Sequence, residues 1–257
     1  MRNLRVLILV PAVLAAVPAA AQSTFPESEQ YSFRLQGRLW GPGISSEIQS
    51  SGRSEGTLID VVRDLGVEDQ STFEGRLTVQ MGLGHKFRLG YTNLRYTGEK
   101  RITKEIRFGD TTYPRSTLLV SSLKGSYFSG DYEMDFMKGS SGYLGALVGG
   151  KFFDLDAVLS APERAERDVE TVRVPVPVVG LVGQAYYGRF SAGAELSGFT
   201  IGPTANFVEL YVHGRFEVGS QLGIEAGYRV FHVRGEHSDD ILDMTLGGLF
   251  FGAEVNF

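Results

Sequence analysis

The sequence predicts an all-β protein: a closed antiparallel up-and-down transmembrane β-barrel of about ten strands, with eight strands as the alternative. Three observations support this prediction. Apolar and polar residues alternate along most of the chain, the alternating segments are long, and short connections between them alternate with longer, more charged ones. Alternation is the signature of a strand with two different faces, and alternating connection lengths are typical of membrane barrels.

The last segment shows the alternation most clearly. Its apolar parity is Leu249, Phe251, Ala253, Val255 and Phe257, and the other parity is Phe250, Gly252, Glu254 and Asn256. A period of two residues places these two sets on opposite faces of a strand. A soluble β-sandwich would alternate too. The segments here, however, are much longer than the roughly five to six residues that average strands contain, which favours a membrane barrel.

We expect ten strands, at residues 31–49, 71–83, 86–107, 112–137, 143–157, 170–187, 189–200, 205–218, 221–235 and 241–257. Tight turns follow every second strand, at 84–85, 138–142, 188 and 219–220, whereas 50–70 and 158–169 are longer. An even strand count places both termini and the short turns on the periplasmic side and the longer loops outside.

Two segments depart from regular strand pattern. Pro175 and Pro177 cannot donate hydrogen bonds to a ladder, so we expect them near the outer rim, above the hydrocarbon. Residues 56–69 carry apolar side chains at helical spacing, and Gly66 could end a short helix there. A bent extension of the first hairpin is the alternative for that segment.

The N-terminus predicts a cleaved signal peptide, residues 1–21, followed by a single mature domain, residues 22–257. Arg2 and Arg5 precede an apolar stretch at 6–17, and small residues end the segment at Ala19–Ala21. This order is that of a secretory signal. A membrane-anchoring helix is the alternative, and Pro11 within the apolar stretch argues against it.

Composition excludes several functions. The formal net charge is −5 and no basic patch is visible, so nucleic acid is not an expected partner. The chain has no Cys, which excludes disulfides and thiol chemistry. Four His without metal-ligand spacing, and glycines without a phosphate-binding motif, predict neither a metal site nor a cofactor.

If the apolar parity faces lipid, the other parity fills the lumen with charges of both signs. The candidates for this lumen charge network are Arg34, Arg38, Glu74, Arg76, Arg88, Asp131, Glu133, Asp135, Lys151, Glu195, Glu209, Arg215, Glu217, Glu225, Arg229 and Glu254. A barrel of eight to ten strands has room only for its own side chains or one small ligand. We therefore favour a structural salt-bridge core over a solute path, with Lys151 as the partner of the three carboxylates at 131–135.

Most aromatic residues are expected to form interfacial girdles facing the membrane, a role that needs no binding site. They are Phe33, Trp40, Phe87, Tyr91, Phe128, Tyr132, Phe136, Phe152, Tyr228, Phe251 and Phe257.

The signal peptide, the alternating strands and the terminal Phe257 together resemble the family of small bacterial outer-membrane β-barrel proteins of Gram-negative envelopes. Phe257 resembles the end of the strand that barrel-assembly machinery recognises, and it is our candidate assembly signal. Residues 56–66, GTLIDVVRDLG, also fit a pattern of that family. The resemblance implies an outer-membrane location and contact with lipid, lipopolysaccharide and the assembly machinery. It leaves the oligomeric state and the function open.

Three functions therefore remain. The leading hypothesis is a structural or surface-interaction protein with a charge-filled lumen and exposed outer loops. The second is a narrow, porin-like channel for small or hydrophobic solutes, in which the glycine-rich stretches 142–150 and 180–193 would leave a side opening. The third is a membrane-embedded hydrolase of omptin or lipid A-modifying type.

No catalytic residue is assigned for a hydrolase. The candidates are His237 with Asp239 or Asp240 in one outer loop, because a His beside a carboxylate can act as a base. Asp60 and Asp64 are the only candidates for the acidic pair of omptins. His213 and His232 have no serine motif beside them. Outer loops are commonly rich in Asp and Glu, so we favour a non-enzymatic role.

Overall fold

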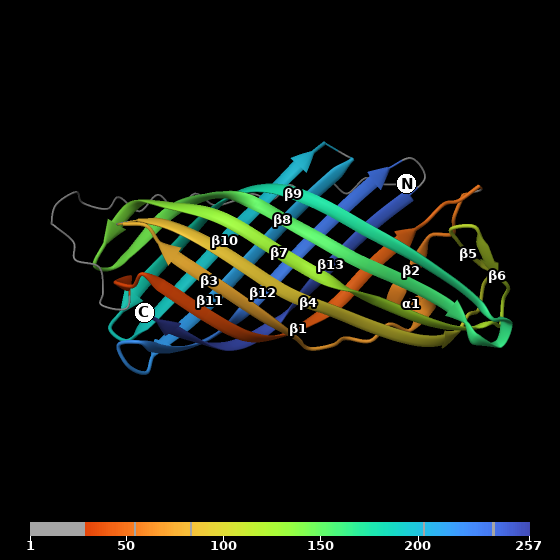
Figure 1. The fold of residues 1–257 in the computed structure, drawn as a ribbon, viewed down its shortest axis with the longest axis horizontal. Coiled ribbons are helices and arrows are strands. Elements are labelled where there is room, and N and C mark those ends of the chain that lie inside the picture. Colours follow the sequence, from red (N-terminus) through yellow and green to blue (C-terminus); the bar gives the residue numbers. More distant parts are fainter. Residues whose placement is uncertain (1–28, 54, 83, 203, 238–239) are drawn as a thin grey trace, which may run out of the picture.

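The computed structural model describes residues 29–53, 55–82, 84–202, 204–237 and 240–257. The expected signal peptide, residues 1–21, lies outside the described residues. Ten long strands form one antiparallel barrel, in which each strand pairs with its neighbours along the chain and the last pairs with the first (Figure 1). The prediction of a closed up-and-down ten-stranded β-barrel is therefore confirmed.

The barrel strands lie close to their expected positions. They are β1 (Phe33–Gln49), β3 (Thr72–Gln80), β4 (His85–Arg101), β7 (Leu118–Gly139), β8 (Gly142–Ala161), β9 (Glu166–Tyr187), β10 (Phe190–Ile201), β11 (Ala205–Glu217), β12 (Leu222–His237) and β13 (Asp240–Asn256). The smaller elements are β2 (Ile59–Asp60), α1 (Val61–Leu65), β5 (Ile106–Phe108), β6 (Thr111–Tyr113) and a 3₁₀ turn, Pro162–Arg164. Within the described residues, no helix has the length and apolar character needed to cross a membrane.

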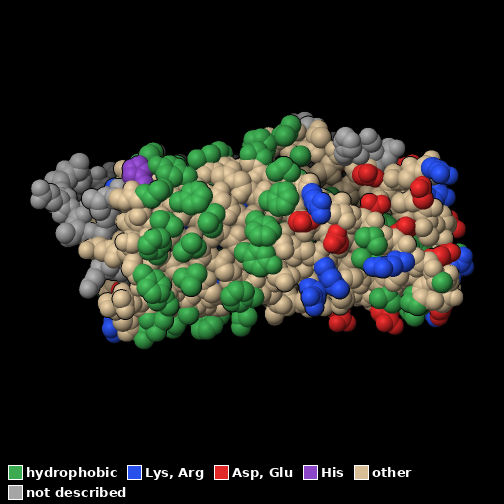
Figure 2. All heavy atoms as spheres, in the orientation of Figure 1, with side chains coloured by type: hydrophobic (Ala, Val, Ile, Leu, Met, Phe, Trp, Pro, Cys, Tyr) green, Lys and Arg blue, Asp and Glu red, His purple; other side chains and the backbone are tan. Residues whose placement is uncertain are grey.

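The outer face of the barrel has two zones (Figure 2). Exposed Leu, Val, Phe and Tyr side chains gather towards the end that carries the C-terminus and the tight turns. Examples are Leu35, Phe73, Leu89, Leu181 and Phe251. Charged side chains gather towards the other end. We refer to the first zone as the apolar belt. It is the surface that a lipid bilayer would cover, and the charged zone would then stand in water outside.

Two connections differ from expectation. The third and fourth strands were expected to run to 107 and from 112, but β4 ends at Arg101 and residues 106–113 fold back as the β5–β6 hairpin. This happens because Ile106, Phe108 and Tyr113 turn inward and become buried. Conversely, the expected loop 158–169 is mostly strand, because β8 and β9 pair from Ala161↔Glu166 downward. Glu163, Arg164 and Arg167 are exposed in this region, whereas Glu166 and Asp168 are half-buried.

The barrel closes along the β1–β13 seam. These strands pair over their whole length, from Arg34↔Asn256 to Gln49↔Ile241. Phe257 extends the seam by one residue: its N–H donates to the carbonyl oxygen of Phe33 (2.8 Å), and its own carbonyl oxygen accepts from the N–H groups of Ser32 and Phe33.

Removing Phe257 is expected to impair assembly, because those backbone groups would then lose their partners at the closing seam. The measurement is the fraction of membrane-extracted protein that runs as a distinct folded band before boiling on a gel. Deleting Phe257 should lower this fraction strongly, whereas Glu163→Ala, in the exposed 3₁₀ turn, should not. Equal folded fractions would contradict the role of Phe257.

Candidate functional site: an apolar cavity above an aromatic plug and a charge network

The half of the lumen nearer the tight turns, which we call the periplasmic half after its expected side, is filled by charged side chains. Of the sixteen charged residues expected to face the lumen, fourteen are buried, and Arg76 and Glu217 are half-buried. These residues come from nearly all the strands because each strand presents every second side chain to the narrow interior.

Each buried cation of the described residues bridges two carboxylates. Arg34 and Arg215 both contact Glu29 and Glu254, Arg38 contacts Glu74 and Glu225, and Arg229 contacts Glu74 and Glu209; Lys151 contacts Asp131 and Glu209, Arg88 contacts Glu133 and Glu195, and Lys86 contacts Glu133 and Asp135. The pairs therefore link into a cross-braced network. This arrangement satisfies the requirement that buried charges be partnered.

Three members of this network were missed from the sequence. Lys86 has the same parity as Arg88, and it rather than Lys151 lies next to Glu133 and Asp135, at 3.0 and 3.1 Å. Glu29 precedes the first strand and enters the lumen from below. Gln36 donates to Glu225 and Glu254. The strand parity could have identified Lys86 and Gln36, but nothing in the sequence points to Glu29.

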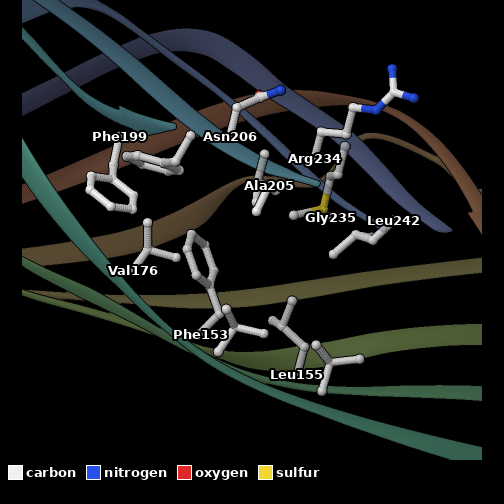
Figure 3. A pocket seen from close by; sticks show the side chains of 14 residues that line it. Phe153, Leu155, Val176, Phe199, Ala205, Asn206, Arg234, Gly235 and Leu242 are labelled. Atoms are coloured by element: carbon white, nitrogen blue, oxygen red, sulfur yellow. The ribbon is translucent and has the colours of Figure 1, made fainter. Parts of the chain in front are cut away.

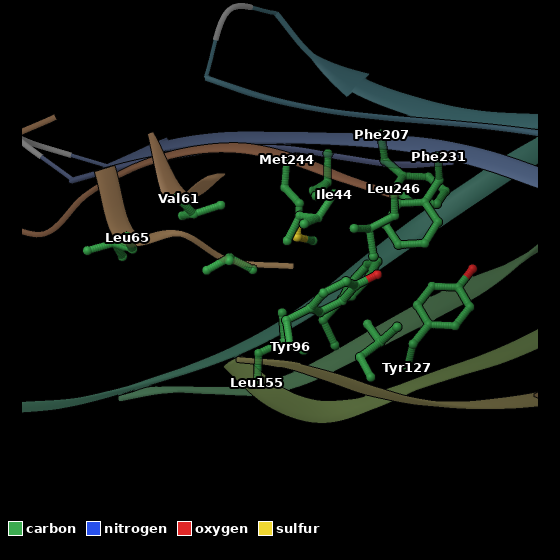
Figure 4. Close-up of a cluster of buried hydrophobic side chains, with 14 of the residues drawn as sticks. Ile44, Val61, Leu65, Tyr96, Tyr127, Leu155, Phe207, Phe231, Met244 and Leu246 are labelled. Carbon is green, nitrogen blue, oxygen red and sulfur yellow. The ribbon is translucent and has the colours of Figure 1, made fainter. Parts of the chain in front are cut away.

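Above the charges lies an aromatic plug, which we define as Trp40, Tyr127, Phe153, Phe207 and Phe231. Their rings contact one another in a chain, with centroids 6.0 Å apart for Trp40–Phe231, 5.6 Å for Tyr127–Phe231 and 4.8 Å for Tyr127–Phe153. Figure 4 shows Tyr127, Phe207 and Phe231 near Leu246. The plug fills the middle of the lumen.

The expectation that Trp40 belongs to an interfacial girdle is wrong. Its side chain is 1% exposed and points inward. The cause is parity: Trp40 follows Arg34, Gln36 and Arg38 at even spacing, so it shares their face of β1. The Arg229 guanidinium lies 4.8 Å from its ring centroid, which joins the plug to the charge network.

The outer half of the lumen is apolar and contains a cavity of about 390 Å³. Ile44, Leu155, Ala157 and Met244 line its wall, and Val61 and Leu65 of α1 face it from the outer end (Figure 4). The volume is in the range that holds one small ligand. The sequence-based expectation of a wholly charged lumen therefore describes only its periplasmic half.

Helix α1 roofs this cavity. Asp60 caps its first turn by accepting from the Arg63 N–H (2.8 Å), and Gly66 ends it with a φ of 67°. Gly98 of β4 allows the close approach, because a Cβ at this position would lie 2.7 Å from the Leu65 carbonyl oxygen. The helical turn expected within 56–69 is therefore present and covers the mouth of the barrel. Just before it, β2 pairs with the end of β1 (Ile48↔Ile59), so the first hairpin is also extended by two residues.

A second, smaller cavity of about 100 Å³ adjoins the first, and Leu155, Val172, Val174, Ala205, Leu242 and Met244 line both. Figure 3 shows Val176 of β9 and Phe199 of β10 on one side of it, and Arg234 and Leu242 on the other. It lies where β9 continues past the end of β10. The apolar interior therefore reaches the wall of the barrel at this place.

The hydrolase candidates do not form a recognisable site among the described residues. The side chain of His237 and all of Asp239 lie outside them, and Asp240 accepts from the Ser51 N–H (2.7 Å). Partial burial raises the pKa of Asp64, but hydrogen bonds from Lys104 and the Asp60 N–H, together with the charges of Lys104 and Arg63, hold it below its usual value. Asp64 is therefore an ionised partner of Lys104 (2.6 Å), and Asp60 is a helix cap.

The remaining His residues lie outside the lining of the two apolar cavities. His213 lies beside the Tyr211 ring in the charge network, and His232 contacts Thr245 (3.0 Å) and Asp243 on the outer face. His85 contacts Tyr132 (2.7 Å) at the periplasmic end. Within the described ranges, no group of three His, Asp or Glu side chains is placed to hold a metal ion.

Comparison with known proteins supports the fold alone. No protein-family model matches the chain, and no curated protein matches its sequence. Among solved structures, the outer membrane protease OmpT from Escherichia coli is similar, with a TM-score of 0.55 and 10% identity over 90% of this chain and 100% of OmpT. By fold the chain is a small outer-membrane β-barrel.

Two further barrels have lower scores, which carry no argument about function. The translocator domain of autotransporter NalP from Neisseria meningitidis has a TM-score of 0.47 and 10% identity over 89% of this chain and 90% of that one. Ail from Yersinia pestis, solved with a heparin analogue, has a TM-score of 0.40 and 11% identity over 88% of this chain and 99% of Ail.

Arg229→Leu is expected to destabilise the barrel by about 3–5 kcal/mol, because it leaves Glu74 and Glu209 buried without their shared cation. The matched control is Arg173→Leu, which removes an exposed pair with Asp154 (3.1 Å) and should cost less than about 1 kcal/mol. The measurement is the temperature at which the folded gel band disappears. Similar losses for the two variants would show that the lumen network does not stabilise the fold.

Proposed function

We propose that this chain is an outer-membrane binding protein that holds one small apolar molecule in the outer half of its barrel and does not conduct solutes through the membrane. The observation that carries the proposal is the 390 Å³ cavity, which is apolar and roofed by α1. It joins the smaller cavity, whose lining includes Phe153 and Phe207 of the aromatic plug. This function refines the hypothesis of a surface-interaction protein by giving that protein a ligand class.

The lower lumen supports a role without conduction. A continuous water path would have to pass the ring contacts of the plug and then the ion pairs of Arg38, Arg229 and Lys151. Opening such a path would separate buried charges from their partners, which costs several kcal/mol for each. The lower lumen therefore serves as a rigid base for the cavity.

The cavity wall favours an apolar ligand. Aliphatic side chains dominate it, and they come from six barrel strands as well as from α1. An apolar molecule that enters it leaves water or lipid for a surface that it can contact closely on all sides. Its wall includes the hydroxyls of Ser46, Ser121 and Ser122, but among the described residues that line it there is no His to activate them. Binding without chemistry is therefore the simplest use of this geometry.

Trp40 offers a direct test, because it is the only tryptophan of the chain and its ring belongs to the plug beneath the cavity. In phosphatidylcholine vesicles, 1-bromododecane should quench the fluorescence of Trp40 in a saturable way. Ala157→Phe, which places a ring inside the cavity, should weaken the apparent affinity about tenfold, equivalent to about 1.4 kcal/mol.

The control for this experiment is Ala226→Phe, which adds the same ring on the lipid-facing side of β12. Its quenching curve should match that of the unmodified protein. If Ala157→Phe and Ala226→Phe give the same curve, or if quenching never saturates, the cavity is not a binding site and the proposal fails.

Conductance provides an independent check. The purified protein should give no steady ion current in planar bilayers, because the plug and the charge network together close the lumen. Steady, large currents would instead support the narrow-channel alternative and contradict a filled lumen.

A further inference from the structure

The barrel wall has a notch beside β9. Strand β10 pairs with β9 only up to Gly198↔Val179, whereas β8 pairs with β9 up to Ala161↔Glu166. Above Val179, one edge of β9 therefore lacks a neighbouring strand. In the described residues, no backbone hydrogen bond from outside β8 reaches positions 171–178. The smaller cavity lies at this notch and joins the larger one.

The base of the notch lies within the apolar belt. The outward-facing side chains of β9 are Leu181, Val179, Pro177 and Pro175 in ascending order, and the next is Arg173, which pairs with Asp154 of β8. On β9 the first charged residue thus lies one step above Pro175, and Arg234, which pairs with Glu236, borders the same cavity from β12. Because the β9 residues follow one another on one strand, their order along the barrel axis is the same whatever the tilt of that strand. The smaller cavity therefore lies against the barrel wall near the upper edge of the apolar belt on β9.

The two prolines suit an edge that faces lipid. The β8–β9 ladder runs without a break through Phe152↔Pro175 and Gly150↔Pro177. A proline cannot donate a hydrogen bond, so a continuous ladder requires both nitrogens to point away from β8, towards the notch. In a strand, the N–H groups of every second residue point to the same side. On the notch side of β9, the residues within the belt that would point their N–H groups outward from the ladder are 175 and 177. Both N–H groups that would face lipid unpaired are therefore missing.

This feature also argues against strand addition at the notch. A peptide strand that paired with β9 would need the N–H groups that Pro175 and Pro177 lack. The free carbonyl oxygens are the only polar groups that remain on that stretch of the edge, and proteins tolerate those unpaired more readily than N–H groups.

We propose that the cavity is filled sideways from the outer leaflet, through the notch between β9 and the β10–β11 turn, by the alkyl chain of a membrane-dissolved molecule with an uncharged head. The inference rests on the proposed function, since it identifies the class and the entry route of the ligand. The notch is open at the level of the lipid chains, and α1 covers the cavity towards water, with Val61 and Leu65 buried beneath it.

The head group follows from the charges near the opening. Glu170, Glu236 and Asp240 line the large cavity at the outer ends of β9, β12 and β13. Arg234 is the cation at the smaller cavity, and it is paired with Glu236. The net negative charge repels a carboxylate or phosphate head, whereas a hydroxyl or carbonyl head could hydrogen-bond at this rim without that repulsion.

The entry route can be tested by thiol labelling, because the chain has no cysteine of its own. Ala157→Cys places one thiol in the large cavity and outside the lining of the notch. In vesicles, dodecyl methanethiosulfonate dissolved in the bilayer should modify this thiol faster than the water-soluble trimethylammonium-ethyl methanethiosulfonate. The acidic rim attracts the cationic reagent, so a slow reaction with it would reflect the roof rather than repulsion.

Variants at the notch then separate the two routes. Added to Ala157→Cys, Ala205→Phe should slow the bilayer reagent about tenfold, equivalent to a barrier about 1.4 kcal/mol higher, and leave the aqueous reagent unchanged. Phe199→Ala should widen the notch and speed the bilayer reagent, so the test does not depend on one bulky variant. Ala226→Phe, facing lipid elsewhere, should change neither rate.

The head-group class is tested by quenching of Trp40 with 12-bromododecanol and with 12-bromododecanoate at neutral pH. The alcohol should bind at least as tightly as the bromoalkane, and the carboxylate more weakly. Equal rates for both thiol reagents, with no effect of Ala205→Phe or Phe199→Ala, would overturn sideways entry. Saturable quenching of Trp40 could still occur in that case, so the failure of the route and that of the binding function are distinguishable.

Discussion

The structure depends first on the requirement that every backbone N–H group within the membrane be paired or absent. Closure of β13 onto β1 meets it around the barrel, with the seam extended by the hydrogen bonds of Phe257. The same requirement explains the notch. There β9 continues beyond its last pairing with β10, and its unpaired edge carries proline at the two positions whose N–H groups would otherwise face lipid. The opening is thus compatible with a membrane barrel rather than a defect in it.

The interior obeys a second requirement, which is that charges removed from water must be partnered. A ten-stranded barrel brings side chains from opposite walls within reach, so buried cations such as Arg38 and Arg229 can bridge two carboxylates from different strands. The aromatic plug rests on this network through Tyr127, whose hydroxyl donates to Glu209 (3.1 Å), and through Arg229 beneath Trp40. The network and plug give the apolar cavity a fixed floor.

The strand pattern predicted the barrel and most of the charge network because both depend on a period of two residues, which is local. Lys86 and Trp40 follow the same rule. Lys86 has the parity of Arg88 but was left out of the lumen network, and Trp40 has the parity of Arg38 but was assigned to the membrane-facing girdle. The cavity could not be predicted in this way. It depends on α1 folding over the mouth and on Ile106, Phe108 and Tyr113 turning inward, which are long-range contacts. The channel hypothesis would place a side opening at the glycine-rich stretches 142–150 and 180–193, but these are paired in the sheet apart from the turn at Gly188. It lies higher, where the unequal lengths of β9 and β10 create it.

The division of the lumen into two halves also bears on how a ligand would leave. A molecule held above the plug has no path downward that does not break ion pairs. Helix α1 is held at β4 by Lys100, which donates to the Arg63 carbonyl oxygen, and by the adjoining Val67–Gly98 bridge. Asp64 also pairs with Lys104, just after β4. The notch requires no such rearrangement, because its lining is mostly apolar and its cation, Arg234, pairs with Glu236 and Asp243 of β12 and β13 rather than with β9. Exchange through it costs only the contacts of the ligand itself. A barrel built in this way would equilibrate with the outer leaflet and stay sealed towards the periplasm.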